Sequence, residues 1–293
     1  MASLPAVDIR RAVRMGLEED LGQGDITTTT LFSKPTPARA KIIVQQPLVV
    51  AGMAAAIQTF IVVDASLKLT PSLQDGSQAR TGDVLLQIEG DGRSILSAER
   101  VALNFLQHLS GIATLTDRFC RAVQGYPVDI MDTRKTIPGW RALQKWAVSL
   151  GGGTNHRTSL GDCILIKDNH LALMGDKKQA VLKACRLARA MASTDKPVIV
   201  EVESLSEVHD ALQGKADIIL LDNMPPATVT RAVKLIAGRA LVEVSGGITL
   251  KNVRAMAAAG PDRISIGALT HSASAATLSL VLEPLRRHRE PRG

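Results

Sequence analysis

The sequence is poor in aromatic residues, in cysteines and in long apolar runs, and each shortage excludes a class of protein. Phe, Trp and Tyr make up 2% of its 293 residues, too few for the stacked surfaces that bind single-stranded nucleic acid. Cys120, Cys163 and Cys185 form no C-x-x-C pair, which indicates reduced thiols in a cytoplasm rather than a disulfide framework. No apolar run is long enough to span a membrane, and the charges from Asp8 to Asp20 are unlike a signal peptide.

Basic residues outnumber acidic ones by 35 to 28, a net charge of +7. This excess is divided between a central segment, 132–170, and a C-terminal run, 286–289, which we interpret as solvated. The central segment has six lysines and arginines against three acids, and it is rich in glycine. Cations at this density have little structural use in a soluble protein. The segment therefore predicts a pocket for a polyanion.

The two parts of the chain have different patterns. The first predicts a mixed α/β domain, with a helix at Val7–Leu21, strands at Ala38–Gln46, Leu67–Thr70 and Val84–Ile88, and a helix at Ser94–Leu109 that Gly111 ends or hinges. From Ile112 onward, short apolar strands alternate with amphipathic helices, a pattern typical of a parallel sheet covered on both sides. The strands are expected at Val128–Met131, Cys163–Ile166, Pro197–Val202, Asp217–Leu221, Ala240–Val244 and Arg263–Ile266. The helices are expected at Trp140–Leu150, Lys177–Met191, Ser204–Gln213, Pro225–Ala237 and Leu250–Ala259. Six strands fall short of the eight of a full barrel, so we predict an open, incomplete α/β barrel.

Polar residues or glycines follow each of the six predicted strands. They are Asp132 to Lys135, Lys167 to His170, Glu201 with Glu203, Asp222-Asn223, Ser245 to Thr249, and Gly267-Ala268. A single polar ending, such as Asp222-Asn223, is more often a turn or a helix cap. Because the carboxyl ends of barrel strands form the active-site face, six such endings in a row indicate a binding site there.

Two glycine segments belong to this predicted site. Ser245-Gly246-Gly247 precedes a helix expected to begin near Thr249, so its backbone N–H groups and the helix dipole predict a phosphate site, although a plain turn has the same sequence. Gly267 would line the same place. Gly151-Gly152-Gly153 either ends the preceding helix or brings Asn155-His156-Arg157 to a ligand, and both can hold. His156 could also be a packed core histidine.

Several motifs in order resemble the quinolinate phosphoribosyltransferase family, also called carboxylating nicotinate-nucleotide pyrophosphorylases. They are Thr133-Arg134-Lys135-Thr136-x-Pro138-Gly139-x-Arg141, Gly151-Gly152-Gly153-x-x-His156-Arg157, Ile166 to His170, Glu201-x-Glu203, Leu220 to Asn223 and Ser245 to Ile248, with Glu99 to Asn104 and Ser110 to Ala113 earlier in the chain. The resemblance covers nearly the whole chain. Ile137, Trp140 and Trp146 depart from the usual pattern, and none of them removes a charged group.

The resemblance implies a reaction and a set of site residues. Quinolinate and phosphoribosyl pyrophosphate would give nicotinate mononucleotide, pyrophosphate and CO₂, with Mg²⁺, in the de novo synthesis of NAD. The expected catalytic residues are Lys135, Lys167, Glu201 and Asp222. Arg134, His156 and Arg157 would bind the quinolinate carboxylates, and Lys135 and Lys167 would face phosphoribosyl pyrophosphate. Glu201 and Asp222 would hold the ribose hydroxyls and Mg²⁺. Ser245, Gly246, Gly247 and Gly267 would cradle the 5-phosphate, and Thr133, Ile266 and Ala268 complete the expected substrate-binding set.

The resemblance also implies an architecture. Residues 1–111 would form an N-terminal α/β sandwich, residues 112–270 the open barrel, and residues 271–293 would pack back on the sandwich. A cytoplasmic homodimer, alone or within a larger oligomer, would pair each barrel with the partner's N-terminal domain, and Arg100 would complete the partner's quinolinate pocket. Otherwise Arg100 is a surface arginine paired with Glu99 or with a residue one turn away.

Three other functions remain open from the sequence. A pyrophosphorylase-like relative associated with molybdenum transport would use a different acceptor. A Schiff-base lyase would use Lys167, because such lysines also end barrel strands. A nucleic-acid-binding module would explain the basic charge, but the scarcity of aromatic residues and the position of the charge argue against it.

Overall fold

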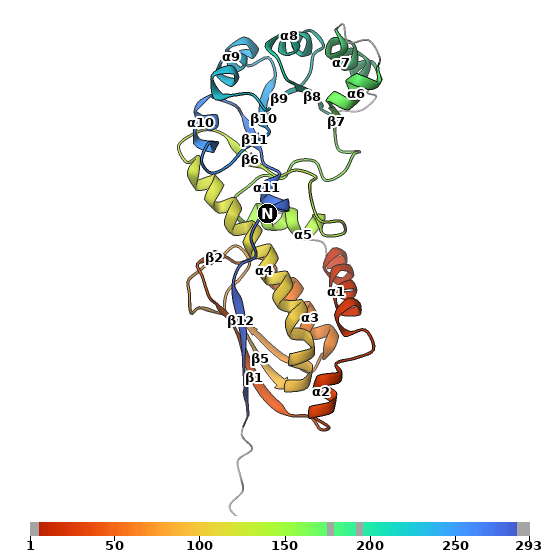
Figure 1. Cartoon of the computed structure of the whole chain (residues 1–293), viewed down its shortest axis with the longest axis vertical. Coiled ribbons are helices and arrows are strands. Elements are labelled where there is room, and N and C mark those ends of the chain that lie inside the picture. Colours follow the sequence, from red (N-terminus) through yellow and green to blue (C-terminus); the bar gives the residue numbers. More distant parts are fainter. Residues whose placement is uncertain (1–5, 175–178, 192–195, 286–293) are drawn as a thin grey trace, which may run out of the picture. The chain divides into compact units, whose positions relative to one another are not determined.

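The computed structural model describes residues 6–174, 179–191 and 196–285, which form two compact units. The first unit comprises the described residues up to Leu115, Ile137–Gly151, and those from Ala273 onward, and the second comprises Thr116–Thr136 and Gly152–Ser272 (Figure 1). The segment Ile137–Gly151 thus packs with the first unit, although it lies within the barrel region of the sequence. The predicted C-terminal run 286–289 and the first residues of the predicted helix Lys177–Met191 lie outside the described residues.

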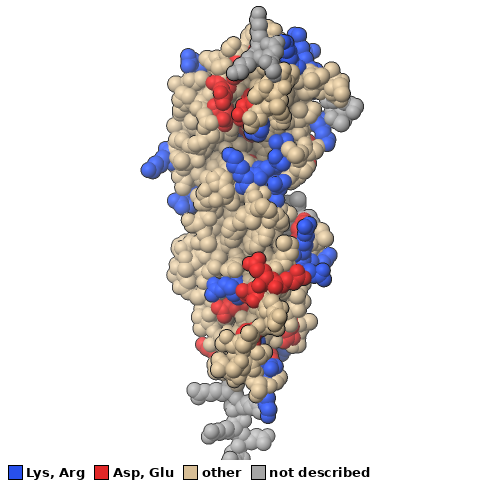
Figure 2. Space-filling model, turned by 45° about the vertical axis from the view of Figure 1, so that its right-hand side comes forward, with Lys and Arg blue, Asp and Glu red and all other residues tan. Residues whose placement is uncertain are grey.

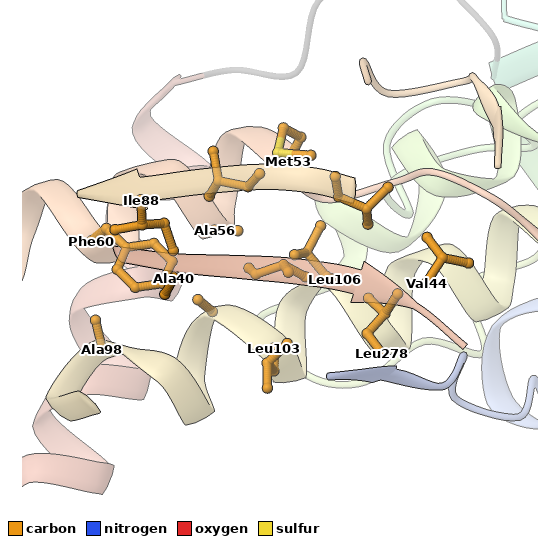
Figure 3. Packing of buried hydrophobic residues seen from close by; sticks show 14 of the residues in the cluster. Ala40, Val44, Met53, Ala56, Phe60, Ile88, Ala98, Leu103, Leu106 and Leu278 are labelled. Carbon is orange, nitrogen blue, oxygen red and sulfur yellow. The ribbon is translucent and has the colours of Figure 1, made fainter. Parts of the chain in front are cut away.

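The first unit is an antiparallel sheet covered by helices. Its elements are α1 (Ala6–Leu21), α2 (Ile26–Leu31), β1 (Pro37–Val44), β2 (Leu48–Val49), α3 (Met53–Val63), β3 (Lys68–Pro71), β4 (Gln78–Ala79), β5 (Val84–Asp91), the first part of α4 (Gly92–Ala122), α5 (Arg141–Leu150) and β12 (Leu278–Pro284). The sheet has the order β12-β1-β5-β3, and β2 pairs with β4 separately. Side chains of β1 alternate between buried and exposed, as expected for a sheet with one face on a core. Phe60 from α3 and Leu103 and Leu106 from α4 pack against that face (Figure 3).

Helix α4 differs from the prediction, because it neither ends nor breaks at Gly111 but continues to Ala122. A Cβ atom at position 111 would lie 2.1 Å from the backbone oxygen of Ser274. Gly111 is therefore required by the close approach of the 274–275 backbone, not by a helix end. The prediction of a helix ending near Leu109 was wrong because it treated the glycine as a local signal.

The second unit confirms the predicted open barrel. Its strands are β6 (Asp129–Met131), β7 (Ile164–Ile166), β8 (Val198–Val202), β9 (Ile218–Asp222), β10 (Leu241–Ser245) and β11 (Arg263–Ser265). They form one parallel sheet in the order β6-β11-β10-β9-β8-β7. Across the described residues β6 and β7 do not pair, so the sheet stays open between its first two strands in the sequence.

Helices follow these strands. They are α6 (Asp168–Leu173), α7 (Ala180–Met191), α8 (Leu205–Gln213), α9 (Pro226–Ile236), α10 (Val253–Ala258) and α11 (Ala268–His271). Helices α7 to α10 lie close to the predicted positions, whereas the short α6 and α11 were not predicted. Ser204 caps α8, because its side chain accepts the Glu207 N–H. Helix α10 begins at Val253, later than predicted, so its dipole lies farther from the Gly246-Gly247 turn than expected. In the described part of the chain, no helix is long and apolar enough to cross a membrane.

Candidate active site

A cavity of about 670 Å³ opens at the carboxyl ends of the second unit's strands. Every residue predicted to bind substrate lines it, with the exception of Arg100. These residues are Thr133, Arg134, Lys135, His156, Arg157, Lys167, Glu201, Asp222, Ser245, Gly246, Gly247, Ile266, Gly267 and Ala268. On the face shown in Figure 2, Lys and Arg side chains gather in a group on the second unit, beside a smaller group of acids. The structure brings the predicted residues together, and their individual ligand roles stay predictions.

Lys167 and Glu201 form an ion pair across neighbouring strands. Lys167 follows β7, Glu201 lies on β8, and the Lys167 Nζ is 2.5 Å from Glu201 Oε2. The Glu201 side chain is 12% exposed and that of Lys167 is 43% exposed, so the ammonium group stays open to a ligand while its partner carboxylate is largely shielded. The pair therefore presents a positive charge to the cavity on an anchored side chain.

Asp222 is held at the end of β9 by two side chains. Its Oδ1 accepts a hydrogen bond from Ser245 Oγ at 2.7 Å, and its Oδ2 accepts one from Asn223 Nδ2 at 2.6 Å. Asn223 has a left-handed backbone with φ 51°, a conformation that asparagine tolerates better than most residues. Ser245, predicted as a phosphate ligand, thus also orients the carboxylate of Asp222.

The turn after β10 has the open backbone that a phosphate group requires. Gly246 and Gly247 have φ values of 89° and 61°, and their N–H groups donate to no other residue that the structure describes. Asn252 Nδ2 fixes the turn by donating to Gly247 O at 2.9 Å. Unpaired N–H groups on adjacent left-handed residues form a concave site for an anion.

Gly267 leaves room for the side chains of Lys135 and His271 at the cavity wall. A Cβ atom at position 267 would lie 3.0 Å from both Lys135 Cδ and His271 Nε2. Thr270 Oγ1 donates to Lys135 O at 2.7 Å, which fixes the Lys135 backbone against α11. His271 lines the cavity and was missed by the sequence reasoning. Its position one helical turn after Gly267 could have indicated that it lies at the same cavity.

Two buried acids hold the loop that carries His156. Asp132, fully buried after β6, accepts the His156 N–H on Oδ1 at 2.8 Å and the Asn155 side chain on Oδ2 at 2.9 Å. Glu243 on β10 lies 3.2 Å from His156 Nε2 through Oε1. Glu243 was missed by sequence reasoning, and its signal was a single acid inside an otherwise apolar strand. The His156 side chain is 9% exposed, so it is largely buried and held by the protein although it lines the cavity. Its role as a ligand stays a prediction.

His170 and Arg100 have different surroundings from the residues above. The His170 ring accepts the Lys167 N–H on Nδ1 at 2.9 Å, so it caps the start of α6 rather than lining the cavity. Arg100 lies exposed on α4 in the first unit. Its side chain makes no ion pair or hydrogen bond with any described residue, so the predicted pair with Glu99 or with a residue one turn away is not present.

Comparison with known proteins assigns the chain to a family. Residues 25–110 match the N-terminal domain and residues 112–281 the C-terminal domain of quinolinate phosphoribosyl transferase. The chain belongs to the quinolinate phosphoribosyltransferase family. It is 39% identical to the probable carboxylating nicotinate-nucleotide pyrophosphorylase of Bacillus subtilis, over 89% of each chain. It is 38% identical to decarboxylating quinolinate phosphoribosyltransferase 1b of Nicotiana tabacum, over 95% of this chain and 83% of the relative.

Solved structures of the family have the same fold. The nicotinate-nucleotide pyrophosphorylase of Francisella tularensis superimposes with a TM-score of 0.89 at 37% identity, over 96% of this chain and 98% of that chain. The match extends along nearly all of both proteins, so it covers both units of the present chain. Family membership confirms the resemblance that the motifs indicated.

Proposed function

We propose that this protein converts quinolinate and phosphoribosyl pyrophosphate into nicotinate mononucleotide, pyrophosphate and CO₂. The observation that carries the proposal is the single cavity in which the arginines, lysines and glycine turn of the family motifs converge. Family membership and the names of the relatives support it. The reaction is a step in the synthesis of pyridine nucleotides.

The cations of the cavity suit a dicarboxylate acceptor. Arg134, which follows β6, and His156 and Arg157, on the loop held by Asp132 and Glu243, all line the cavity. Two adjacent carboxylates need more than one cationic partner, and guanidinium groups can bind a carboxylate through two parallel hydrogen bonds. A pyridine with one carboxylate would leave one of the two guanidinium groups, Arg134 or Arg157, without a counter-charge from the ligand. We therefore assign the two arginines to the carboxylates of the acceptor, with His156 beside them at the cavity wall.

Other residues that line the cavity suit the phosphoribosyl donor. The Gly246 and Gly247 N–H groups would bind the 5-phosphate, and Lys135 and Lys167 would neutralise the pyrophosphate. As the bond from the ribose to the pyrophosphate breaks, positive charge develops on the sugar. Glu201 and Asp222 lie on adjacent strands, and their fixed carboxylates would stabilise that charge and bind the ribose hydroxyls.

Mg²⁺ fits this donor set as an ion held mainly by substrate. No cluster of three or more His, Cys, Asp or Glu side chains suited to a metal is present in the part of the chain that the structure describes. Mg²⁺ commonly takes one or two protein carboxylates and completes its shell with phosphates and water. Glu201 and Asp222 would hold it. When bound, it would neutralise charge on the leaving pyrophosphate.

Loss of CO₂ follows from the chemistry of the bound acceptor. Once the ring nitrogen carries the ribose, its positive charge stabilises the electron pair left on the adjacent carbon when CO₂ departs. The protein's part is to fix the acceptor and to neutralise its carboxylates. That carbon then takes up a proton from water, so the step needs no base from the protein.

A shared active site in a cytoplasmic homodimer is part of the proposal. The exposed Arg100, without an intramolecular partner among the described residues, would reach the quinolinate pocket of the partner subunit. Symmetric dimers place the same surface on both subunits, so each chain would complete the other's site.

The Schiff-base alternative fits the site less well. A lysine that attacks a carbonyl must have its amine free, yet Lys167 Nζ is engaged by the Glu201 carboxylate at 2.5 Å, and the arginines and glycines around it suit oxyanions better than a carbonyl. The molybdenum-associated alternative would use a different acceptor with the same phosphoribosyl donor. Acceptor choice therefore separates it from the proposal.

The test is a comparison of acceptors with purified protein, phosphoribosyl pyrophosphate and Mg²⁺. We expect turnover of quinolinate and none of nicotinate, because an unpaired buried charge costs on the order of 3 kcal/mol or more. Product should be identified as nicotinate mononucleotide by chromatography and mass. Comparable turnover of nicotinate, or no turnover of quinolinate, would contradict the proposal.

A further inference from the structure

Glu243 is a fully buried carboxylate in which one oxygen makes all the contacts. Its Oε1 accepts a hydrogen bond from Ser265 Oγ at 2.5 Å and lies 3.2 Å from His156 Nε2. Its Oε2 is buried and has no hydrogen-bond partner among the described residues. Glu243 also lines the cavity, as do the two arginines assigned to quinolinate.

Such a group is unfavourable for folding. A buried carboxylate loses its hydration, and an oxygen without a partner leaves that loss uncompensated. Replacing buried charged groups with well-packed apolar side chains often leaves the stability of a protein unchanged or raises it. The carboxylate of Glu243 therefore points to a role other than packing.

The neighbouring hydrogen bonds define what the carboxylate does to His156. The His156 Nδ1 accepts the Arg157 backbone N–H at 2.7 Å, so in this arrangement Nδ1 carries no proton. The ring proton is then on Nε2, where it faces Glu243 Oε1. Glu243 selects the tautomer in which Nδ1 can bind the Arg157 backbone.

The result is a backbone held from two sides. Asp132 Oδ1 accepts the His156 N–H at 2.8 Å, and the His156 ring accepts the next N–H, that of Arg157. The Cα of Arg157 is thereby fixed, and its guanidinium group starts from a defined position at the cavity wall. Positioning of this kind determines the affinity of a bidentate carboxylate contact, since both hydrogen bonds depend on orientation.

We propose that Glu243 is a positioning residue for the acceptor: it fixes the His156 ring and, through that ring, the Arg157 backbone. This inference rests on the proposed function, which makes quinolinate the ligand. Glu243 acts through His156 and does not take part in the chemistry. Ser265 supports it by occupying the same oxygen and orienting the carboxylate.

Other charged or titratable groups also lie around His156 and contribute to its electrostatic environment. Asp132 contacts its backbone from the loop after β6. Cys163, just before β7, lies near Arg157 and Glu243, and burial raises the pKa of its thiol, so it stays neutral near pH 7. Arg134, Lys135 and Lys167 line the same cavity. Because none of these is changed by a substitution at Glu243, the effect of the carboxylate can be isolated.

The test uses three substitutions in the full chain. Glu243→Leu removes both the charge and the acceptor, Glu243→Gln keeps an acceptor without the charge, and Ser265→Ala removes the supporting contact. For Glu243→Leu we expect the KM for quinolinate to rise about tenfold. In metal sites, removing the group that orients a metal-binding histidine has an effect of at least this size. The kcat, the KM for phosphoribosyl pyrophosphate and the melting temperature should change little. Glu243→Gln should restore part of the loss, and Ser265→Ala should have a smaller effect.

A second readout needs no substrate. Nitrogen-15 NMR of the six histidine rings, with His156 assigned by its loss in a His156→Asn variant, reports which ring nitrogen carries the proton. The wild type should show His156 protonated on Nε2, and Glu243→Leu should show a mixture of tautomers.

The outcomes separate this inference from the proposed function. Unchanged tautomers, or an unchanged KM for quinolinate in a folded Glu243→Leu protein, would overturn the role of Glu243. Tighter quinolinate binding would also overturn it, since that result would mean Glu243 merely repels the dianion. If the wild-type protein does not use quinolinate at all, the proposed function fails, while the NMR result still decides whether Glu243 holds the ring.

Discussion

Substitution of Gly246 tests whether the Gly246-Gly247 turn binds a phosphate group or is an ordinary turn. Gly246 and its neighbour Gly247 both have positive φ values, 89° and 61°. The space around them differs. A Cβ atom at Gly246 would lie 2.2 Å from Asn223 Oδ1 and 2.9 Å from the Asn223 backbone nitrogen, whereas one at Gly247 would meet no atom within 4 Å. Gly247→Ala is therefore a matched control for Gly246→Ala.

The expected free energies follow from this geometry. Placing an alanine in a left-handed conformation costs about 1–2 kcal/mol, and this cost applies to both variants. Gly246→Ala must in addition displace the Asn223 side chain and backbone, and overpacking of this kind costs about 1–3 kcal/mol. The Asn223 side chain donates to Asp222, so the displacement also disturbs a carboxylate assigned to the ribose. We expect Gly246→Ala to lose about 2–5 kcal/mol in total and Gly247→Ala about 1–2 kcal/mol.

The measurement combines denaturation with ligand binding. Both tryptophans, Trp140 and Trp146, lie in the first unit, so unfolding of the second unit should be followed by circular dichroism rather than by tryptophan fluorescence. Calorimetric titration then compares phosphoribosyl pyrophosphate with quinolinate. Gly246→Ala should weaken binding of the donor more than that of the acceptor. Equal stability of the two variants, or unchanged donor affinity in folded Gly246→Ala, would refute the reasoning.

Three further outcomes are expected. Lys167→Met should lower kcat about 10²-fold or more, because it removes a preorganised cation and leaves Glu201 without the ammonium group 2.5 Å away; a change in KM alone would argue for simple binding. Arg100→Ala and Lys135→Ala chains should each be nearly inactive alone. After subunit exchange, about a quarter of all sites should have wild-type composition if each site draws one residue from each chain. Activity that stays at the level of the parent proteins after verified exchange would rule out the shared site. Chelation of Mg²⁺ should abolish turnover and leave the melting temperature almost unchanged. The protein would supply only the carboxylates of Glu201 and Asp222, and substrate and water would supply the other ligands. A large loss of stability would indicate a structural metal.

The sequence predicted the barrel strands well for a physical reason. Strands buried on both faces are continuous apolar runs, as in β9, where four of its five residues are buried. Short strands between helices leave few alternatives for their boundaries. The cations and glycines that follow them were recognisable for the same reason, since strand ends of a parallel sheet meet at one edge.

What the sequence could not show depends on contacts between distant segments. Strand β12 pairs with β1 in register from Ala38↔Pro284 to Val44↔Leu278. The family resemblance implied that the C-terminal segment packs back on the first domain, but no local pattern reveals this strand or its register. The continuation of α4 through Gly111 depends on the backbone near Ser274. Glu243 could not be recognised because its contacts, His156 and Ser265, approach it from other segments.

The most direct test of the central claim uses quinolinate labelled with carbon-13 in the carboxyl group next to the ring nitrogen. In the presence of phosphoribosyl pyrophosphate and Mg²⁺, we expect one labelled CO₂ and one pyrophosphate to be released for each nicotinate mononucleotide formed. Retention of the label in a ribosylated product, or release of pyrophosphate without CO₂, would contradict the account.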